Sequence, residues 1–204
     1  MEDGSHRASL DLSKGHRELS VGEQRSPAQR GLAEPVRMEY VIKLRALSES
    51  DVSTLVEINN SGYPGVPMED AAQMGALLEM SSLALGALDD NGELIGFVLA
   101  LDSGQNYQSE NYVFFESQFR NHFYIDRIVL SADARGLGAG SALYEAIFDH
   151  ARKAGLERIT CEVNIEPPNP GSLRFHRRWG FEDVATQPTK GGSVLVQLLQ
   201  APLV

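Results

Sequence analysis

The sequence predicts a mixed α/β domain in which helices flank a central, mixed, mostly antiparallel sheet of six to seven strands. Three observations lead to this fold class. Segments with the apolar spacing of helices alternate along the chain with segments that alternate like strands. Two pairs of strand-like segments are joined by short turn sequences, as in β-hairpins. One further strand-like segment leads through a glycine-rich turn into an amphipathic helix.

The N-terminal part of this pattern predicts one strand and two helices. Residues 41–47 alternate like a strand, and Ser48 or Ser50 can cap a first helix that includes residues 55–58. After a turn-rich link, residues 69–80 are expected to form a second helix.

Two β-hairpins are expected. Asn91-Gly92 favours a tight turn between residues 83–88 and 94–101, because Asn-Gly readily adopts positive φ. A second hairpin joins residues 182–187 to residues 193–199. Both pairings would be antiparallel.

The remaining elements lie between the two hairpins. Residues 102–120 are rich in aromatic side chains and are expected to be irregular. They are followed by a strand over 123–130, a helix over 138–154, a strand over 158–164 and a short helix over 170–178.

Composition indicates one domain in a reducing, cytoplasmic setting. A chain of 204 residues with 42% hydrophobic content can bury one sizeable core. No apolar run approaches the roughly 20 residues that span a bilayer, and no membrane association is expected. The single Cys161 cannot form an internal disulfide and is expected to be a small core side chain.

The formal charge of −10 belongs to the domain, because residues 1–37 contain six acids and six bases. We expect residues 1–37 to be a mobile N-terminal extension and residues 38–204 to be the domain. The acidic balance argues against nucleic acid as a partner. It could instead attract a cationic amine, although negative charge also serves solubility.

The turn between residues 130 and 141 has the chemistry of an anion site. Three glycines of Arg135-Gly-Leu-Gly-Ala-Gly140 leave backbone N–H groups uncovered where a helix begins, and these groups can hold a pyrophosphate. The glycines could also serve only to make a tight turn. Ser141-Ala142 after the last glycine excludes a Walker-type phosphate loop. A dinucleotide-binding turn is a remote alternative. Its fingerprint has the third glycine one position later and an acidic residue at the end of the second strand, and neither feature is clearly present.

Two motifs resemble the GNAT superfamily of N-acetyltransferases. The sequence pattern Arg-x-x-Gly-x-Gly over residues 135–140 resembles the acyl-CoA-binding motif of this superfamily. Residues 169–181 resemble its Asn-x-x-Ala/Ser-x-x-Phe-Tyr-x-x-x-Gly-Phe signature, and the likeness extends over residues 39–199. The resemblance implies a GNAT-like sheet that is splayed between its fourth and fifth strands, leaving a wedge for the pantetheine arm of acetyl-CoA.

The resemblance also implies the residues that bind this co-substrate. The main chain of Val129 and Leu130 would hydrogen-bond the pantetheine and polarise the thioester. The remaining cofactor-binding residues implied by the two motifs are Arg135, Gly136, Gly138, Gly140, Ser141, Asn169 and Ser172. No metal site is implied.

Three side chains are candidates for acid–base chemistry. Glu162 is the first candidate for the base and Asp126, on the neighbouring strand, the second, because burial between apolar strands would raise a carboxyl pKa. Either could instead face solvent or pair with an arginine, Arg127 or Arg158. His176 occupies the position at which the signature has Tyr. It could protonate the departing thiolate of coenzyme A, or it could be a hydrogen-bonded polar side chain without a catalytic role.

The resemblance implies an acetyl-CoA-dependent N-acetyltransferase acting on a primary amine of a small molecule or a protein. The alternative is a non-catalytic acyl-CoA-binding sensor or regulatory module, which the missing Tyr would suit. A homodimer is also open, because members of the family are frequently dimers. Acceptor specificity would depend on residues 60–67, residues 107–119 and the C-terminal hairpin.

Overall fold

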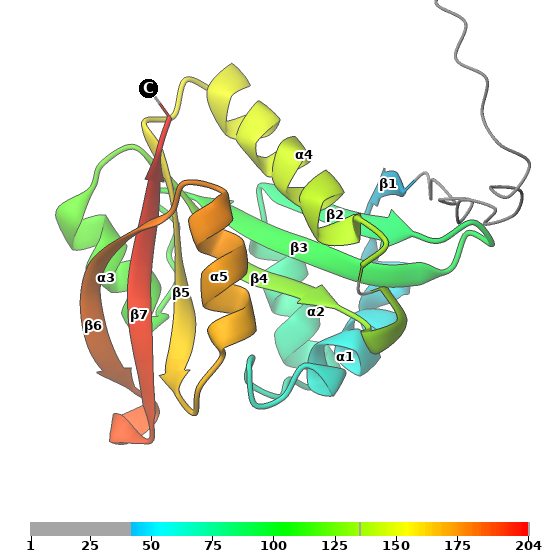
Figure 1. The fold of residues 1–204 in the computed structure, drawn as a ribbon, viewed down its shortest axis with the longest axis horizontal. Helices are drawn as coiled ribbons and strands as arrows, with labels where there is room; N and C mark the ends of the chain where they lie inside the picture. Colours follow the sequence, from blue (N-terminus) through cyan, green and yellow to red (C-terminus); the bar gives the residue numbers. More distant parts are fainter. Residues whose placement is uncertain (1–41, 135, 204) are drawn as a thin grey trace, which may run out of the picture. The chain divides into compact units, whose positions relative to one another are not determined.

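A computed structural model describes residues 42–134 and 136–203 (Figure 1). The expected N-terminal extension, the beginning of the first strand and Arg135 lie outside these residues. Within them, no helix is both long and apolar enough to cross a bilayer.

The predicted mixed sheet is confirmed. Seven strands have the order β1-β2-β3-β4-β5-β7-β6, in which β4 and β5 are parallel and all other neighbours are antiparallel. The strands are β1 Lys43–Ala46, β2 Leu83–Leu88, β3 Leu94–Asp102, β4 His122–Leu130, β5 Arg158–Glu166, β6 Glu182–Thr189 and β7 Val194–Pro202. Both expected hairpins form, as β2–β3 and β6–β7.

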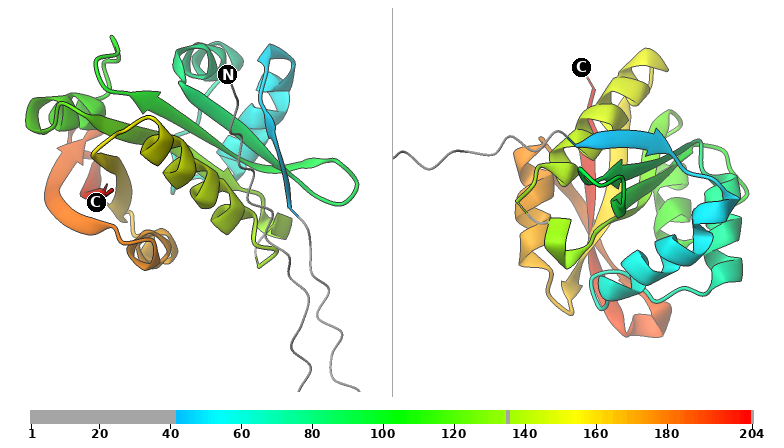
Figure 2. Two further views of the ribbon diagram at one scale, coloured as in Figure 1. Left: turned by 90° about the horizontal axis from the view of Figure 1, so that it is seen from above. Right: turned by 90° about the vertical axis from the view of Figure 1, so that its right-hand side faces the viewer.

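Helices cover both faces of the sheet, as Figure 2 shows. The helices are α1 Val52–Ser61, α2 Ala71–Met80, α3 Glu110–Gln118, α4 Ala139–Lys153 and α5 Pro170–Arg178, with short 3-10 turns η2 Glu49–Asp51, η3 Ala132–Ala134 and η4 Lys190–Gly192. Side chains of α4, such as Leu143 and Ile147, pack with one face of the strands, and α5 lies on this side too. Side chains of α1, α2 and α3 pack on the other face of the sheet. The larger cavity described below lies on this side.

Residues 102–120 were expected to be irregular, but they contain helix α3, so that expectation was wrong. Helix α3 begins after Ser109, whose hydroxyl accepts a hydrogen bond from the main chain of Tyr112. Tyr112 and Phe115, three residues apart, are buried, whereas the equally apolar Val113 is 50% exposed. Because apolar Val113 lies on the exposed side of α3 and polar Asn111 on its buried side, the sequence shows only a weak amphipathic pattern.

The expected divergence of the fourth and fifth strands is present. Strands β4 and β5 pair only from His122 with Arg158 to Ile125 with Cys161, yet they continue to Leu130 and Glu166. The edge of β4 that faces β5 therefore has no strand partner after Ile125. This split in the sheet positions the site.

Candidate active site

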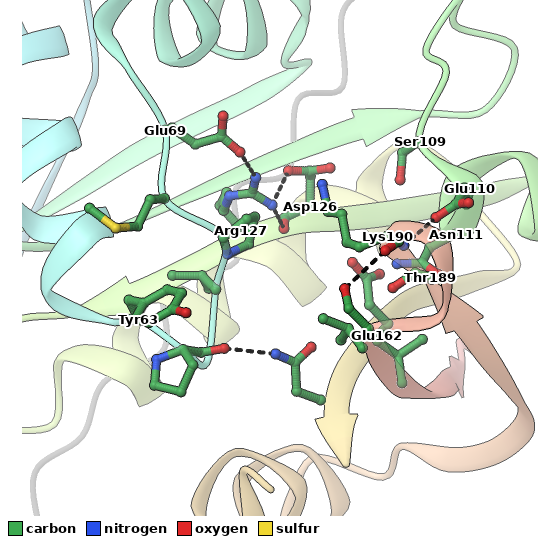
Figure 3. Close-up of a pocket in the computed structure, with 18 of the residues that line it drawn as sticks. Tyr63, Glu69, Ser109, Glu110, Asn111, Asp126, Arg127, Glu162, Thr189 and Lys190 are labelled. Atoms are coloured by element: carbon green, nitrogen blue, oxygen red, sulfur yellow. Dashed lines mark hydrogen bonds and ion pairs between the residues drawn. The ribbon is translucent and has the colours of Figure 1, made fainter. Parts of the chain in front are cut away.

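Two cavities adjoin at the split between β4 and β5. The smaller, of about 210 Å³, lies between the diverging strands and is also lined by residues of α5. The larger, of about 930 Å³, is bounded by the loop between α1 and α2, by the beginning of α3 and by the turn between β6 and β7 (Figure 3). Six residues line both cavities: Val66, Pro67, Asp126, Arg127, Glu162 and Asn164. Two predicted catalytic carboxylates thus lie where the cavities meet.

A β-bulge in β4 turns two consecutive side chains toward the larger cavity. Ala100 of β3 pairs with Ile125 and Leu99 with Arg127, so Asp126 is the extra residue. A bulge of this kind interrupts the strict alternation of side chains and re-aims one of them. Asp126 and Arg127 consequently both contact residues on the α1–α3 face of the sheet.

Asp126 belongs to a buried ion-pair network, one of the alternatives open from the sequence. Its Oδ1 accepts a hydrogen bond of 2.7 Å from the Tyr107 hydroxyl, and its Oδ2 lies 2.8 Å from Arg127 Nη1. The other terminal nitrogen of Arg127 contacts the Glu69 carboxylate at 2.5 Å. Burial opposes the positive charge of Arg127, but the neighbouring carboxylates outweigh burial and raise its pKa. Both terminal nitrogens of Arg127 therefore form ion pairs with carboxylates.

Glu162 has no arginine or lysine partner among the described residues. The Tyr124 hydroxyl donates a hydrogen bond of 2.8 Å to its Oε2. Burial, reinforced by the charge of Asp126, raises the Glu162 pKa to about 7, and hydrogen bonds from Tyr124 and Asn111 partly oppose the increase. A carboxyl group with this pKa can take up and release a proton near neutral pH.

His176 lies in the wall of the smaller cavity, in a largely aromatic environment. It is 3% exposed, and its ring meets those of Tyr144, Phe175 and Phe181 edge to face. Its Nδ1 lies 2.8 Å from the main-chain oxygen of Ser172, which can only accept, so Nδ1 carries the hydrogen. Burial lowers the His176 pKa. Burial therefore favours the neutral imidazole, with its hydrogen on Nδ1.

Four of the expected cofactor-binding residues line the smaller cavity: Val129, Leu130, Asn169 and Ser172. Asn169 also caps α5, because its Oδ1 accepts a hydrogen bond of 3.2 Å from Ser172 N.

The expected pyrophosphate residues Gly136, Gly138, Gly140 and Ser141 do not line either cavity but follow β4 at the beginning of α4. Gly136 and Gly138 have φ of 82° and 90°, a conformation that favours glycine. Gly140 has a different role, because a Cβ there would lie 3.2 Å from the Phe175 ring. It allows α4 to approach α5 closely.

The side chains that surround Asp126, Arg127 and Glu162 were not predicted individually. Tyr124 lies two positions before Asp126 on the same strand, so the period of two could have placed both on one face. Glu69, which pairs with Arg127, comes from a distant segment. Tyr107 and Asn111 lie within residues 107–119, which were expected to affect acceptor specificity but not to contact Asp126 or Glu162.

Tyr124 is expected to position Glu162 and to keep its pKa near neutrality. Because the Tyr124 hydrogen bond lowers the Glu162 pKa, Tyr124→Phe should raise it further. The acidic limb of the pH profile of kcat/KM should then move to higher pH. Tyr112→Phe is a matched control, since the Tyr112 hydroxyl contacts Gln105 and Asp102 rather than Glu162. Identical limbs in the wild type and Tyr124→Phe would show that Tyr124 does not set this pKa.

Comparison with known proteins agrees with this fold. A family model described as the acetyltransferase (GNAT) family matches residues 52–181. A curated relative, the uncharacterized N-acetyltransferase MJ1207 of Methanocaldococcus jannaschii, is 36% identical over 59 residues. This match covers 29% of the chain and spans 25% of the length of that relative.

Solved structures share the fold at low identity. Ard1 from Thermoplasma volcanium has a TM-score of 0.65 at 17% identity, covering 80% of this chain and 98% of that one. The putative acetyltransferase yncA from Salmonella typhimurium, solved with its cofactor acetyl-CoA, has a TM-score of 0.60 at 19% identity, covering 80% and 95%. NAA60 from Arabidopsis thaliana, solved with a bisubstrate analogue, has a TM-score of 0.63 at 18% identity, covering 79% and 98%.

A split mixed sheet with a glycine-rich helix start beside the split is the arrangement that the resemblance to acyl-CoA-dependent transferases implied. The chain belongs to the acetyltransferase (GNAT) family. The family uses acetyl-CoA as the acetyl donor, as the resemblance implied.

Proposed function

We propose that this protein transfers an acetyl group from acetyl-CoA to a primary amine, with Glu162 as the base. The observation that carries the proposal is the meeting of two cavities at Glu162 and Asp126, where the sheet splits. The smaller cavity would receive the thioester end of acetyl-CoA, and the larger the acceptor. Residues 38–204 would form the catalytic domain.

The described residues fit coenzyme A in two respects. The edge of β4 that faces β5 has no strand partner beyond Ile125, which leaves main-chain groups near Val129 and Leu130 free to bond the pantetheine. Helix α4 begins after Gly138 and has no side-chain N-cap, so no capping side chain competes with a pyrophosphate for the N–H groups of its first turn. Acetyl-CoA supplies an activated thioester carbonyl.

The role of Glu162 is to make the amine nucleophilic. Its carboxylate accepts a proton from the bound ammonium, directly or through water. The C–N bond then forms as the C–S bond breaks, and the second nitrogen proton passes to the departing thiolate. We propose that His176 shapes the smaller cavity rather than supplying this proton, since a neutral ring whose Nδ1–H is held by Ser172 is a weak acid. Asp126 would act through its charge, which helps to raise the Glu162 pKa.

The setting of the reaction is also part of the proposal. Cys161 is buried and free, which suits a reducing cytoplasm. The formal charge of −10 favours a cationic amine over nucleic acid or an anionic membrane surface. A homodimer remains a prediction that light scattering would test.

An assay of thiol release tests the proposed function. Thiol should appear from acetyl-CoA when primary amines are added, and not in their absence. Calorimetry should detect acetyl-CoA binding in either case. Binding without release across a broad panel of amines would favour the alternative, a non-catalytic acyl-CoA-binding module.

A further inference from the structure

Two large apolar side chains are exposed in the larger cavity. Tyr63 is 63% exposed and Met68 is 60% exposed, and both belong to the loop between α1 and α2 (Tyr63 is labelled in Figure 3). The remaining large apolar side chain with comparable exposure in the described part of the chain is Val113, which lies on α3 and does not line either cavity. Apolar exposure is thus concentrated beside the proposed reaction centre.

The loop that carries these side chains is fixed by hydrogen bonds at several points. Asn59 Nδ2 donates to the main-chain oxygen of Pro67 at 2.8 Å, and the Asn60 amide bonds both main-chain groups of Glu69. From β5, Asn164 Nδ2 donates to the main-chain oxygen of Pro64 at 2.8 Å. Tyr63 and Met68 are therefore presented by an anchored loop, and their exposure does not result from a lack of loop contacts.

The charges around the larger cavity disfavour an anionic ligand. Four carboxylates line it, from Glu69, Glu110, Asp126 and Glu162, against two cations, Arg127 and Lys190. Arg127 is occupied by two of these carboxylates. Lys190 is exposed, and its main-chain N–H donates to Glu110, which brings a carboxylate beside it. An acceptor carboxylate would meet net negative charge, whereas an ammonium group is attracted.

We propose that the acceptor is a primary alkylamine that carries an apolar group and no carboxylate. This inference rests on the proposed function. The ammonium group binds at Glu162, and the apolar group lies against Tyr63 and Met68 at the loop between α1 and α2. The volume of about 930 Å³ is in the range of pockets that hold small molecules.

A set of matched amines tests the proposal through kcat/KM for thiol release. 2-Phenylethylamine should exceed L-phenylalanine, which adds only a carboxylate, by about 100-fold, because juxtaposed like charges cost several kcal/mol. It should exceed ethylamine, which lacks the ring, by about tenfold or more, because ring burial favours binding. Equal or better use of L-phenylalanine would overturn the proposal, and so would equal use of ethylamine. Faster acetylation of a peptide with N-terminal phenylalanine would also overturn it, because the acceptor would then be a peptide.

Variants of the loop test the placement of the apolar group. In Tyr63→Ala and Met68→Ala, the ratio of kcat/KM for 2-phenylethylamine to that for ethylamine should fall about threefold in each variant, because each removes part of the apolar contact. Val113→Ala is the matched control, an exposed apolar residue outside the cavity, and should keep the wild-type ratio. An unchanged ratio in both loop variants would overturn the placement. Thiol release with ethylamine but not with 2-phenylethylamine would overturn this inference alone, whereas no release with any amine would overturn the proposed function as well.

Discussion

Replacing Glu162 with glutamine should lower kcat/KM for amine acetylation by about 100- to 10,000-fold, the range expected for loss of a general base. Glutamine keeps the size of the side chain and can still accept the hydrogen bond of 2.8 Å from Tyr124, but it cannot take up a proton. Acetyl-CoA affinity should be retained, because the proposed contacts with the co-substrate lie elsewhere. Steady-state kinetics and calorimetry on the same preparation measure the two effects separately.

The pH dependence of kcat/KM should also report the ionisation of Glu162. Activity requires ionised Glu162, whose pKa is raised to about 7, so kcat/KM of the wild type should rise with pH through a limb centred near 7. Glu162→Gln should lack that limb. Glu166→Gln is a matched control on the same strand, because Glu166 is exposed and does not line either cavity. An intact acidic limb in Glu162→Gln would assign the base to another group.

Replacing Arg127 with methionine should destabilise the domain by about 3–5 kcal/mol, the usual cost of removing one partner from a buried ion pair. Arg127 is 7% exposed and contacts two carboxylates, so the variant leaves Asp126 and Glu69 without their cation. Denaturant unfolding monitored by the single Trp179 measures the loss in the free energy of unfolding.

The matched control for this variant is Arg177→Met. Arg177 pairs with Asp183 at 3.1 Å, but both side chains are about half exposed, and such surface pairs contribute about 0–1 kcal/mol. Similar losses in the two variants would show that the network around Arg127 contributes no more than a surface pair. Because the charge of Arg127 also lowers the Glu162 pKa, the acidic limb of Arg127→Met should move to higher pH.

Much of the fold could be predicted because its determinants are local. The hairpin at Asn91-Gly92, the glycine-rich start of α4 and the alternation of β4 and β5 each depend on neighbouring residues. Helix α3 could not be recognised by the same means. Its buried Tyr112 and Phe115 share the helix with the apolar Phe114 and the exposed Val113, so no apolar stripe stands out.

Only part of the site could be predicted from the sequence, because many of its contacts join distant segments. Glu162 and Asp126 could be placed together because they lie on adjacent strands, one step beyond the last pair of Ile125 with Cys161. The bulge that aims Arg127 at Glu69 depends on the register with β3, which local patterns do not specify. The environment of Glu162 also includes Asn111, which α3 brings from a distant segment.

The most direct measurement is a crystal structure of the protein with acetyl-CoA bound. We expect the diphosphate at the first turn of α4, the pantetheine along the unpaired edge of β4, and the thioester carbonyl where the two cavities meet, within reach of Glu162 directly or through one water. A thioester outside the gap between β4 and β5, or one separated from Glu162 by protein atoms, would contradict this mechanism.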